Sequence, residues 1–175
     1  KEKLMVIWIT GISGAGKTTL AKFFLKNKKF QSVYFDGDQF RKILGNDIKY
    51  TLKDRDINAH RLTRLVKYLS DQKLNIIISA NLTSRKYRNW CKKNIKNYIE
   101  IFIDADIKNL VKRDYKKLYS KAIKGKIKNV VGVDLPFKKP LGSNIYIKNN
   151  STKKKFLQNI KLINKYINQN KIKIY

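Results

Sequence analysis

Gly11-Ile12-Ser13-Gly14-Ala15-Gly16-Lys17-Thr18 is the stretch that decides the fold, because it matches the phosphate-binding pattern G-x-x-x-x-G-K-[ST] without a departure. Glycines at these spacings let successive backbone N–H groups point at phosphate oxygens, and the helix that follows adds partial positive charge. Lys17 supplies a cation for the β- and γ-phosphates, and Thr18 offers a hydroxyl to Mg²⁺. We expect this segment, extended by Thr19, to bind a nucleoside triphosphate with its magnesium ion, and the motif alone leaves open a kinase, an ATPase, a GTPase or a motor.

The residues outside this loop alternate between two hydrophobic patterns. Short continuous apolar runs predict buried parallel strands, and apolar residues every three or four positions predict helices. The predicted strands are 4–10, 32–35, 74–79, 98–104 and 144–148; the predicted helices are 17–25, 54–71, 84–97, 107–124 and one that begins at 151–152. Strands that alternate with helices predict an α/β class, here a five-stranded parallel sheet covered by helices on both faces to make three layers.

A length of 175 residues predicts a single domain over 1–175. The long irregular stretch 125–142 contains both prolines and several lysines. Loops of this length inside compact domains are usually functional elements. We therefore expect a lid over the active site, spanning about 116–142.

The composition is strongly basic, with 41 Lys+Arg against 12 Asp+Glu and a net charge of +29. Such a charge favours polyanionic partners, although Lys, Ile, Asn and Tyr all have A/T-rich codons and the basic residues form no single block. Attraction of anionic small substrates is the more modest interpretation. The single cysteine, Cys91, excludes an internal disulfide, and the absence of an apolar run of about 20 residues or of a leader peptide favours a cytoplasmic protein.

Two carboxylates and an arginine follow the second predicted strand, in Asp36-Gly37-Asp38-Gln39-Phe40-Arg41. Residues at the carboxyl end of a parallel strand lie beside the ligand crevice. There Asp36 and Asp38 could serve Mg²⁺ and an attacking hydroxyl, and Arg41 could bind a substrate phosphate. An alternative for Asp38 is a helix N-cap, since Asp is a strong capping residue.

Several motifs together resemble those of adenylyl-sulfate kinases, from Leu4 to about Pro140. They are, in order, Gly11–Thr19, Asp36-Gly37-Asp38-x-x-Arg41, Asp54-Arg55-x-x-Asn58-x-x-Arg61, Leu118-Tyr119-x-Lys121-Ala122 and Gly132-Val133-Asp134. The resemblance implies transfer of the ATP γ-phosphoryl group to the 3′-hydroxyl of a 5′-modified nucleotide, adenylyl sulfate in this family. It also implies a three-layer P-loop kinase fold, ATP and Mg²⁺ as cofactors, and a homodimer with a mobile lid. The partners it implies are small-molecule nucleotides rather than nucleic acid.

The resemblance also implies roles for individual residues. Lys17, Asp36 and Asp38 would be catalytic, with Asp36 and Thr18 at the metal and Asp38 beside the ribose hydroxyl. Arg113 would approach ATP. The acceptor would be contacted by residues from four parts of the chain, namely Arg41, Tyr50, Arg55, Asn58, Ile78, Ser79, Lys121, Val130 and Asp134.

Three departures from the family pattern lie on the acceptor side. Tyr50 can form one wall of a base pocket, but Val130 stands where a second aromatic ring is expected, which could weaken base stacking by about 1–3 kcal/mol. An expected Ser-Pro pair reads Ser79-Ala80, and an expected Asp-Arg pair is absent around 84–88. A smaller base would fit such a pocket, so cytidine diphosphoramidate, the acceptor of a related capsule-biosynthesis kinase, is the alternative.

Two other classes of protein stay open from the sequence. The positive charge would suit a polynucleotide kinase or an ATPase that binds nucleic acid, although the compact acceptor motifs do not favour it. A catalytically silent interaction domain would not need intact Lys17, Thr18, Asp36 and Asp38. The sequence gives no role for His60.

Overall fold

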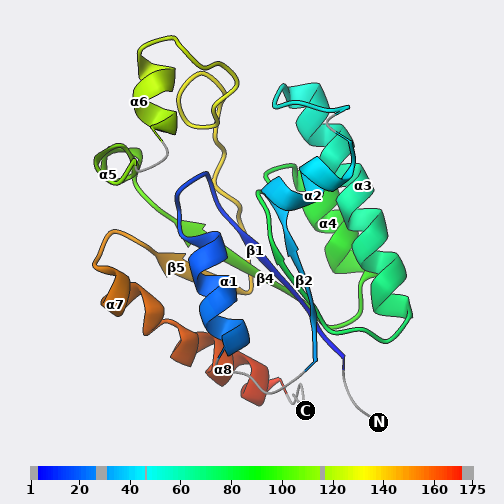
Figure 1. The fold of residues 1–175 in the computed structure, drawn as a ribbon. Coiled ribbons are helices and arrows are strands. Elements are labelled where there is room, and N and C mark those ends of the chain that lie inside the picture. The colour runs from blue at the N-terminus through cyan, green and yellow to red at the C-terminus, as the bar shows by residue number, and fades with distance from the viewer. Residues whose placement is uncertain (1–3, 27–30, 46, 115–116, 171–175) are drawn as a thin grey trace.

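The computed structural model describes residues 4–26, 31–45, 47–114 and 117–170, which contain one all-parallel sheet (Figure 1). Its five strands lie in the order β2-β3-β1-β4-β5, with β1 paired to β3 on one side and to β4 on the other. The strands are β1 (Val6–Thr10), β2 (Val33–Asp36), β3 (Ile76–Ser79), β4 (Tyr98–Asp104) and β5 (Ile145–Lys148). The predicted five-stranded parallel sheet is confirmed.

Helices cover both faces of the sheet and make the three predicted layers (Figure 1). One face carries α1 (Lys17–Lys26), α7 (Lys153–Leu157) and α8 (Ile160–Gln169), and the other carries α2 (Gly37–Ile43), α3 (Leu52–Asp71) and α4 (Arg85–Asn94). Two short helices, α5 (Ile107–Lys112) and α6 (Leu118–Ile123), lie beyond the carboxyl ends of the strands. Within the described ranges, no helix combines the length and apolar character needed to cross a bilayer.

The central strand β1 shows how the sheet separates two cores. Ile7 and Ile9 belong to the cluster that includes α1 and α8, while Val6 and Trp8 belong to the cluster that includes α3 and α4. Successive side chains of a strand point to opposite faces, and here both faces are covered. The continuous apolar run of β1 follows from this double burial.

Two predicted helices are each divided in the structure. The predicted helix 107–124 is two helices, because the Asp114 carboxylate accepts hydrogen bonds from the amides of Leu118 and Ser120 at 2.8 and 2.7 Å, while Lys117 has a left-handed backbone (φ 52°). Positions 115–116, which that prediction included, lie outside the described residues. Such side-chain bonds to backbone amides compete with helix continuation.

The C-terminal helix begins as predicted, since Thr152 is the N-cap of α7. It is divided before Ile160, where Asn159 donates a side-chain hydrogen bond back to the Phe156 carbonyl at 2.7 Å. The predicted buried face nevertheless holds, because Phe156, Ile163 and Ile167 are all buried in one cluster and Ile160 packs against it. The hydrophobic pattern predicted the buried face of this helix correctly, but the prediction of one continuous helix was wrong.

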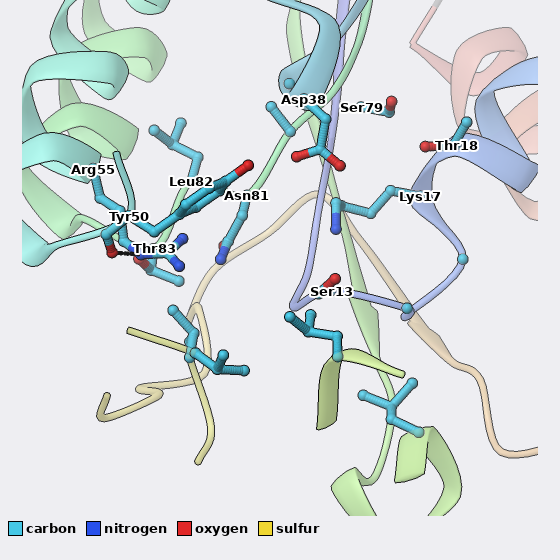
Figure 2. Close-up of a pocket in the computed structure, with 18 of the residues that line it drawn as sticks. Ser13, Lys17, Thr18, Asp38, Tyr50, Arg55, Ser79, Asn81, Leu82 and Thr83 are labelled. Atoms are coloured by element: carbon cyan, nitrogen blue, oxygen red, sulfur yellow. Dashed lines mark hydrogen bonds between the residues drawn. The ribbon is translucent and has the colours of Figure 1, made fainter. Parts of the chain in front are cut away.

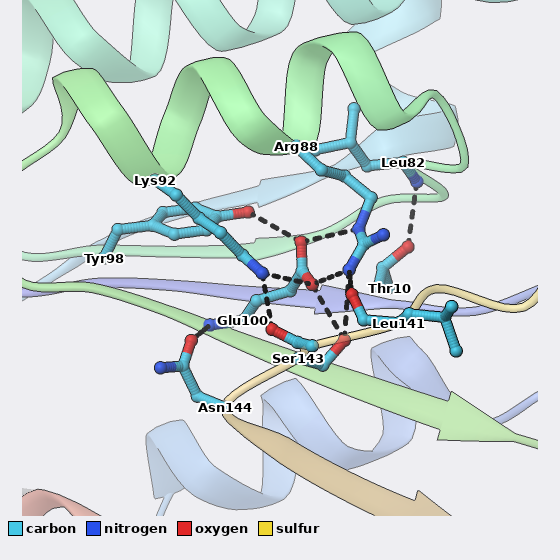
Figure 3. Close-up of polar contacts among 10 residues, drawn as sticks. Thr10, Leu82, Arg88, Lys92, Tyr98, Glu100, Leu141, Ser143 and Asn144 are labelled. Atoms are coloured by element: carbon cyan, nitrogen blue, oxygen red, sulfur yellow. Dashed lines mark hydrogen bonds and ion pairs between the residues drawn. The ribbon is translucent and has the colours of Figure 1, made fainter.

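A buried ion pair lies at the centre of β4, beneath α4 (Figure 3). Glu100 is fully buried and accepts a bond from Arg88 Nε at 2.9 Å and one from Ser143 Oγ at 2.8 Å. Arg88 also donates to the Leu141 carbonyl at 2.9 Å, and Lys92 donates to the Gly142 carbonyl. The network therefore joins α4 and β4 to the segment that leads into β5.

Candidate active site

One large cleft, of about 1220 Å³, opens at the carboxyl ends of the strands (Figure 2). The phosphate-binding loop and the start of α1 form one part of it, and the ends of β2 and β3 form its floor. Residues of α3, the segment 127–131 and the segment 149–153 complete the walls. Parallel α/β sheets bind ligands at this edge.

The predicted loop lies between β1 and α1, which is the context that the motif requires. Gly16 has φ +105°, and a Cβ there would lie 2.9 Å from Asn149 Nδ2 and 3.0 Å from the Phe156 ring. A Cβ on Gly11 would lie 2.6 Å from the Ile103 carbonyl oxygen. Both positions therefore require glycine, because neither the backbone conformation nor the space accepts a side chain.

Lys17 begins α1, and its side chain extends into the cleft near Asp38 (Figure 2). Its Nζ donates a hydrogen bond to the Ile12 carbonyl at 2.9 Å. Ser13, Gly14, Gly16, Thr18 and Thr19 line the same part of the cleft. A cation beside a helix N-terminus makes this part of the cleft suited to phosphate.

Asp36, at the end of β2, accepts several hydrogen bonds on its carboxylate. Thr18 donates to Oδ2 at 2.8 Å and Ser79 at 3.1 Å, and the Tyr34 hydroxyl lies 3.3 Å from the same oxygen. Burial acts to raise the pKa of Asp36, but the hydrogen bonds from Thr18, the Asp38 amide and Ser79 outweigh it and hold this pKa below its ordinary value. The carboxylate is therefore ionised at neutral pH.

Asp36 also begins helix α2, which the sequence did not predict. Its Oδ1 accepts the amides of Asp38 at 3.0 Å and Gln39 at 3.5 Å, so it is the N-cap. The alternative of a cap at Asp38 is wrong, because Asp38 lies inside the first turn of α2 and its exposed side chain lines the cleft.

Two arginines surround Tyr50 on the α3 side of the cleft. The Arg41 guanidinium carbon lies 4.7 Å from the centre of the Tyr50 ring, and that of Arg55 lies 5.6 Å away. Arg55 donates to the carbonyls of Tyr50 at 2.9 Å and Asn129 at 2.8 Å. Burial and the nearby Arg41 cation lower the pKa of Arg55, so this pair of cations would be stabilised by an anionic ligand.

Asn58 and Val130 line the same side, as predicted. Asn58 is 9% exposed, and its Oδ1 has no hydrogen-bond partner among the described residues. Val130 is 5% exposed. The cleft-lining aromatic residues in the described part of the chain are Tyr50, Tyr119 and Phe156, and Tyr119 donates to the Ser13 carbonyl at 2.7 Å, at the phosphate loop.

Arg113 lines the opposite side, where the loop after β5 meets the phosphate loop. It donates to the carbonyls of Asn149 at 3.2 Å and Ser151 at 2.8 Å. Asn149 is buried and donates to the Ala15 carbonyl at 2.8 Å. Arg113 is thus held beside the phosphate loop, and its contact with ATP stays a prediction.

Five predicted site residues do not line the cleft: Gly11, Ala15, Ile78, Lys121 and Asp134. Gly11 and Ala15 are buried and shape the loop, and Ile78 is fully buried in the core. Lys121 is exposed on α6, and Asp134 accepts the amides of Asn129 and Val130, so its carboxylate shapes the loop 129–134.

Some cleft residues were not predicted from the sequence. They are mainly the segment after β3, the loop after β5, and side chains of α3 and α7, namely Asn81, Leu82, Thr83, Ser84, Asp56, Asn149, Ser151, Thr152, Lys153 and Phe156. The rule that strand ends meet at one edge could have found the first two groups. It was applied only to β2 and, through the resemblance, to β3.

Cys91 and His60 lie outside the cleft lining. Cys91 is fully buried on α4, and burial raises the pKa of its thiol to about 12, so it stays protonated. His60 is exposed on α3, with its ring centre 6.0 Å from that of Tyr87.

Comparison with known proteins identifies the family. The family model described as adenylylsulphate kinase matches residues 3–148. A cytidine diphosphoramidate kinase of Campylobacter jejuni is 36% identical over 166 residues, which cover 93% of this chain and 96% of that protein. An adenylyl-sulfate kinase of Clostridium acetobutylicum is 34% identical over 178 residues, covering 98% and 87%.

The fold agrees with these matches. The solved structure of the APS kinase of Mycobacterium tuberculosis in complex with AMPPNP and APS has a TM-score of 0.81, at 24% identity, and covers 96% of this chain and 99% of that one. This chain therefore belongs to the adenylylsulphate kinase family, whose members are phosphotransferases.

Proposed function

We propose that this kinase transfers the γ-phosphoryl group of ATP to the 3′-hydroxyl of a 5′-modified nucleotide. The observation that carries the proposal is the composition of the cleft at the carboxyl ends of the strands. It brings the phosphate loop and Asp36 together with the group formed by Arg41, Tyr50, Arg55 and Asn58. A donor and an anionic acceptor could therefore occupy adjacent parts of one cleft, which is what direct transfer requires.

ATP would lie with its phosphates in the loop Gly11–Thr18 and its nucleoside toward Arg113. Thr18 Oγ1 and Asp36 Oδ2 lie 2.8 Å apart and are hard oxygen donors of the kind that Mg²⁺ takes. These two residues fit the metal, which when bound neutralises charge on the β- and γ-phosphates. The lowered pKa of Asp36 keeps its oxygens available as ligands.

Asp38 would orient the acceptor hydroxyl and take its proton as the bond to phosphorus forms. Phosphoryl transfer has a loose transition state, so positioning and charge neutralisation contribute more than base strength. Lys17 would stabilise the charge on the equatorial oxygens. The segment 116–142, which begins at a position outside the described residues, would act as a lid that excludes water.

The acceptor side suits a small base. One aromatic ring, Tyr50, lies there, and buried Val130 supplies a short aliphatic wall in place of a second ring. Of the acceptors named for the relatives, this favours cytidine diphosphoramidate, the substrate of the C. jejuni kinase. Adenylyl sulfate, named for the other relatives, is the second candidate, supported by Tyr50 and the paired arginines Arg41 and Arg55.

A coupled ATP-consumption assay tests this choice. With Mg²⁺ and ATP present, we expect cytidine diphosphoramidate to give the higher kcat/KM and adenylyl sulfate a lower one. Product analysis should place the new phosphate on the 3′-oxygen. The reverse order would assign adenylyl sulfate, and turnover with neither compound would contradict the proposed reaction.

Asp38→Asn is expected to lower kcat by about a hundredfold, because the amide cannot accept the proton of the hydroxyl. The KM for ATP should change little, since Asp38 is placed on the acceptor side of the transfer. Asp47→Asn is the matched control, as Asp47 is exposed and pairs with Arg61 at 2.7 Å outside the cleft. Steady-state kinetics of both variants check the prediction, and a full-rate Asp38→Asn enzyme would remove Asp38 from the mechanism.

A homodimeric state and a cytoplasmic location stay predictions. Capsule biosynthesis as the setting depends on the cytidine acceptor and is tested by the same assay. Binding of nucleic acid is not favoured, because the relatives in the comparison are named for small-nucleotide substrates.

A further inference from the structure

Asn149 follows β5 directly and is buried on the phosphate-loop side of the cleft, with 5% of its surface exposed. Its backbone amide donates to the Asp104 carbonyl, at the end of β4, at 2.7 Å. Its side chain bonds to the phosphate loop at one end and to Arg113 at the other. Asn149 therefore connects the sheet to two parts of the cleft that the proposed function gives to ATP.

The two ends of the Asn149 carboxamide have different partners, and these partners fix its orientation. Nδ2 donates to the Ala15 carbonyl at 2.8 Å, and Oδ1 accepts from Arg113 Nη1 at 3.4 Å. A carbonyl oxygen can only accept a hydrogen bond, and a guanidinium can only donate one. A carboxamide turned over would set its oxygen against the Ala15 carbonyl and its NH₂ against Arg113. The orientation in the structure is thus the one that both neighbours accept.

The bond from Asn149 acts on the peptide group that joins Ala15 to Gly16. In a trans peptide the carbonyl and the N–H lie in one plane and point in opposite directions, and no peptide bond of the described residues is cis. Because the Ala15 carbonyl points to Asn149, the Gly16 N–H points away from it. Gly16 lines the cleft, and no described residue accepts a hydrogen bond from its N–H. This N–H is therefore available to a phosphate oxygen in the loop.

The packing around Gly16 shows how closely Asn149 supports this peptide. A Cβ on Gly16 would lie 2.9 Å from Asn149 Nδ2 and 3.0 Å from the Phe156 ring. The peptide thus lies against close-packed atoms, and a rotation would have to displace the carboxamide. A group that is held in place before its ligand arrives loses little freedom on binding, which increases affinity.

We propose that Asn149 is a positioning residue of the phosphate loop, which holds the Ala15–Gly16 peptide so that the Gly16 N–H meets a phosphate oxygen of ATP. The inference rests on the proposed function, because it requires the ATP phosphates to lie in this loop. It gives the residue after β5 an effect on phosphate affinity that passes through the Ala15 carbonyl, without a contact between its own side chain and phosphate.

Binding of a phosphate chain without a nucleoside tests the inference and requires no catalysis. Inorganic tripolyphosphate with Mg²⁺ is titrated into the full chain by calorimetry. A parallel titration with the site filled by AMPPNP measures binding elsewhere on this chain, whose net charge is +29, and is subtracted. Asn149→Ala removes the donor to Ala15 and should raise the Kd of tripolyphosphate by about tenfold, as expected for the loss of one hydrogen bond that orders a binding site.

Asn150→Ala is the matched control. The Asn150 side chain also forms two hydrogen bonds, since it accepts from the Asp106 amide at 3.1 Å and donates to the Asp106 carboxylate, and it lies outside the cleft lining. This variant removes the same atoms from the next position of the same segment without changing a contact of the phosphate loop. It should change the Kd of tripolyphosphate by less than about twofold.

A signal from the loop itself separates positioning from a general loss of stability. The amide NMR resonance of Gly16 should shift when tripolyphosphate saturates the unmodified chain, and the shift should be smaller in Asn149→Ala. If that variant does not fold, Asn149→Asp takes its place, because its carboxylate still accepts from Arg113 but has no donor for Ala15. Asn149→Asp should also raise the Kd, and Asn150→Asp is its control for the added negative charge.

Three results would overturn the inference. They are an unchanged Kd in the folded Asn149 variant, an equal rise in the matching Asn150 variant, and tripolyphosphate binding that AMPPNP does not block. The proposed function fails differently. If phosphate affinity depends on Asn149 as expected but no acceptor is phosphorylated, the reaction is wrong and the role of Asn149 stands. If acceptors are phosphorylated while Asn149→Ala keeps its phosphate affinity, the reverse holds.

Discussion

Lys17→Ala is expected to lower kcat/KM by about a thousandfold or more while the fold stays intact. Lys17 is the cation of the phosphate loop, and its Nζ already lies within the loop, 2.9 Å from the Ile12 carbonyl. In the proposed reaction, alanine would remove the charge that meets the β- and γ-phosphates, and the remaining backbone amides would not replace a mobile cation. The loss should appear in both ATP affinity and turnover, measured by steady-state kinetics.

Lys22→Ala is the control for this variant. Lys22 lies on the same helix, is exposed, and is outside the cleft lining, so its removal makes the same change in charge and helix composition. It should leave kcat/KM within about twofold, because surface charges far from phosphate are screened by salt. Near-normal turnover by Lys17→Ala, with circular dichroism unchanged, would refute the assignment of the loop.

Arg88→Ala is expected to lower the free energy of unfolding by about 3–5 kcal/mol. The reason is Glu100, which is fully buried and would lose the bidentate partner that offsets its desolvation. Lys92 lies 3.9 Å from the carboxylate, too far to replace two direct hydrogen bonds. Urea denaturation followed by fluorescence measures the change.

Arg85→Ala, on the exposed first turn of α4, is the matched variant and should change stability by less than about 0.5 kcal/mol. A second comparison separates the buried charge from lost packing. Arg88→Met combined with Glu100→Gln removes both charges and should recover part of the stability. If the double variant is as unstable as Arg88→Ala, packing rather than the uncompensated carboxylate is the cause.

The sheet and its layers could be predicted because each strand is short, apolar and buried on both faces. Continuous apolar runs favour strands at the centre of a sheet that is covered on both faces. Such runs are Val6–Thr10 and the three isoleucines at 76–78. Helix continuity could not be predicted in the same way. At the break before Leu118, the Asp114 carboxylate accepts the amides of Leu118 and Ser120, and at the break before Ile160, Asn159 donates to the Phe156 carbonyl. Side-chain bonds of this kind leave the hydrophobic period unchanged.

The phosphate side of the site was predictable because its chemistry lies in consecutive residues. The residues of the acceptor side come from β2, α3, the segment after β3 and the loop 127–131. No pattern within one segment of the sequence therefore predicts this side of the cleft. Asn81 illustrates the difficulty: an isolated asparagine after a strand is ordinary in sequence. Its place in the cleft lining depends on the position of the segment after β3, whose neighbours Ala80 and Leu82 are bonded to β1.

The connection between α6 and β5 is held firmly at its downstream end. Lys139 pairs with Asp104 at 2.7 Å, and Leu141 and Ser143 bond to Arg88. A chimera that exchanges Gly125–Lys138 for the corresponding stretch of a relative would keep these downstream anchors. It would also exchange Val130 and Val131, which belong to the core, and Phe137, which lies against Phe102 of β4, so the new stretch must keep apolar residues at these positions. Because the loop 127–131 lines the acceptor side of the cleft, exchanging Gly125–Lys138 is a way to change which nucleotide the enzyme accepts.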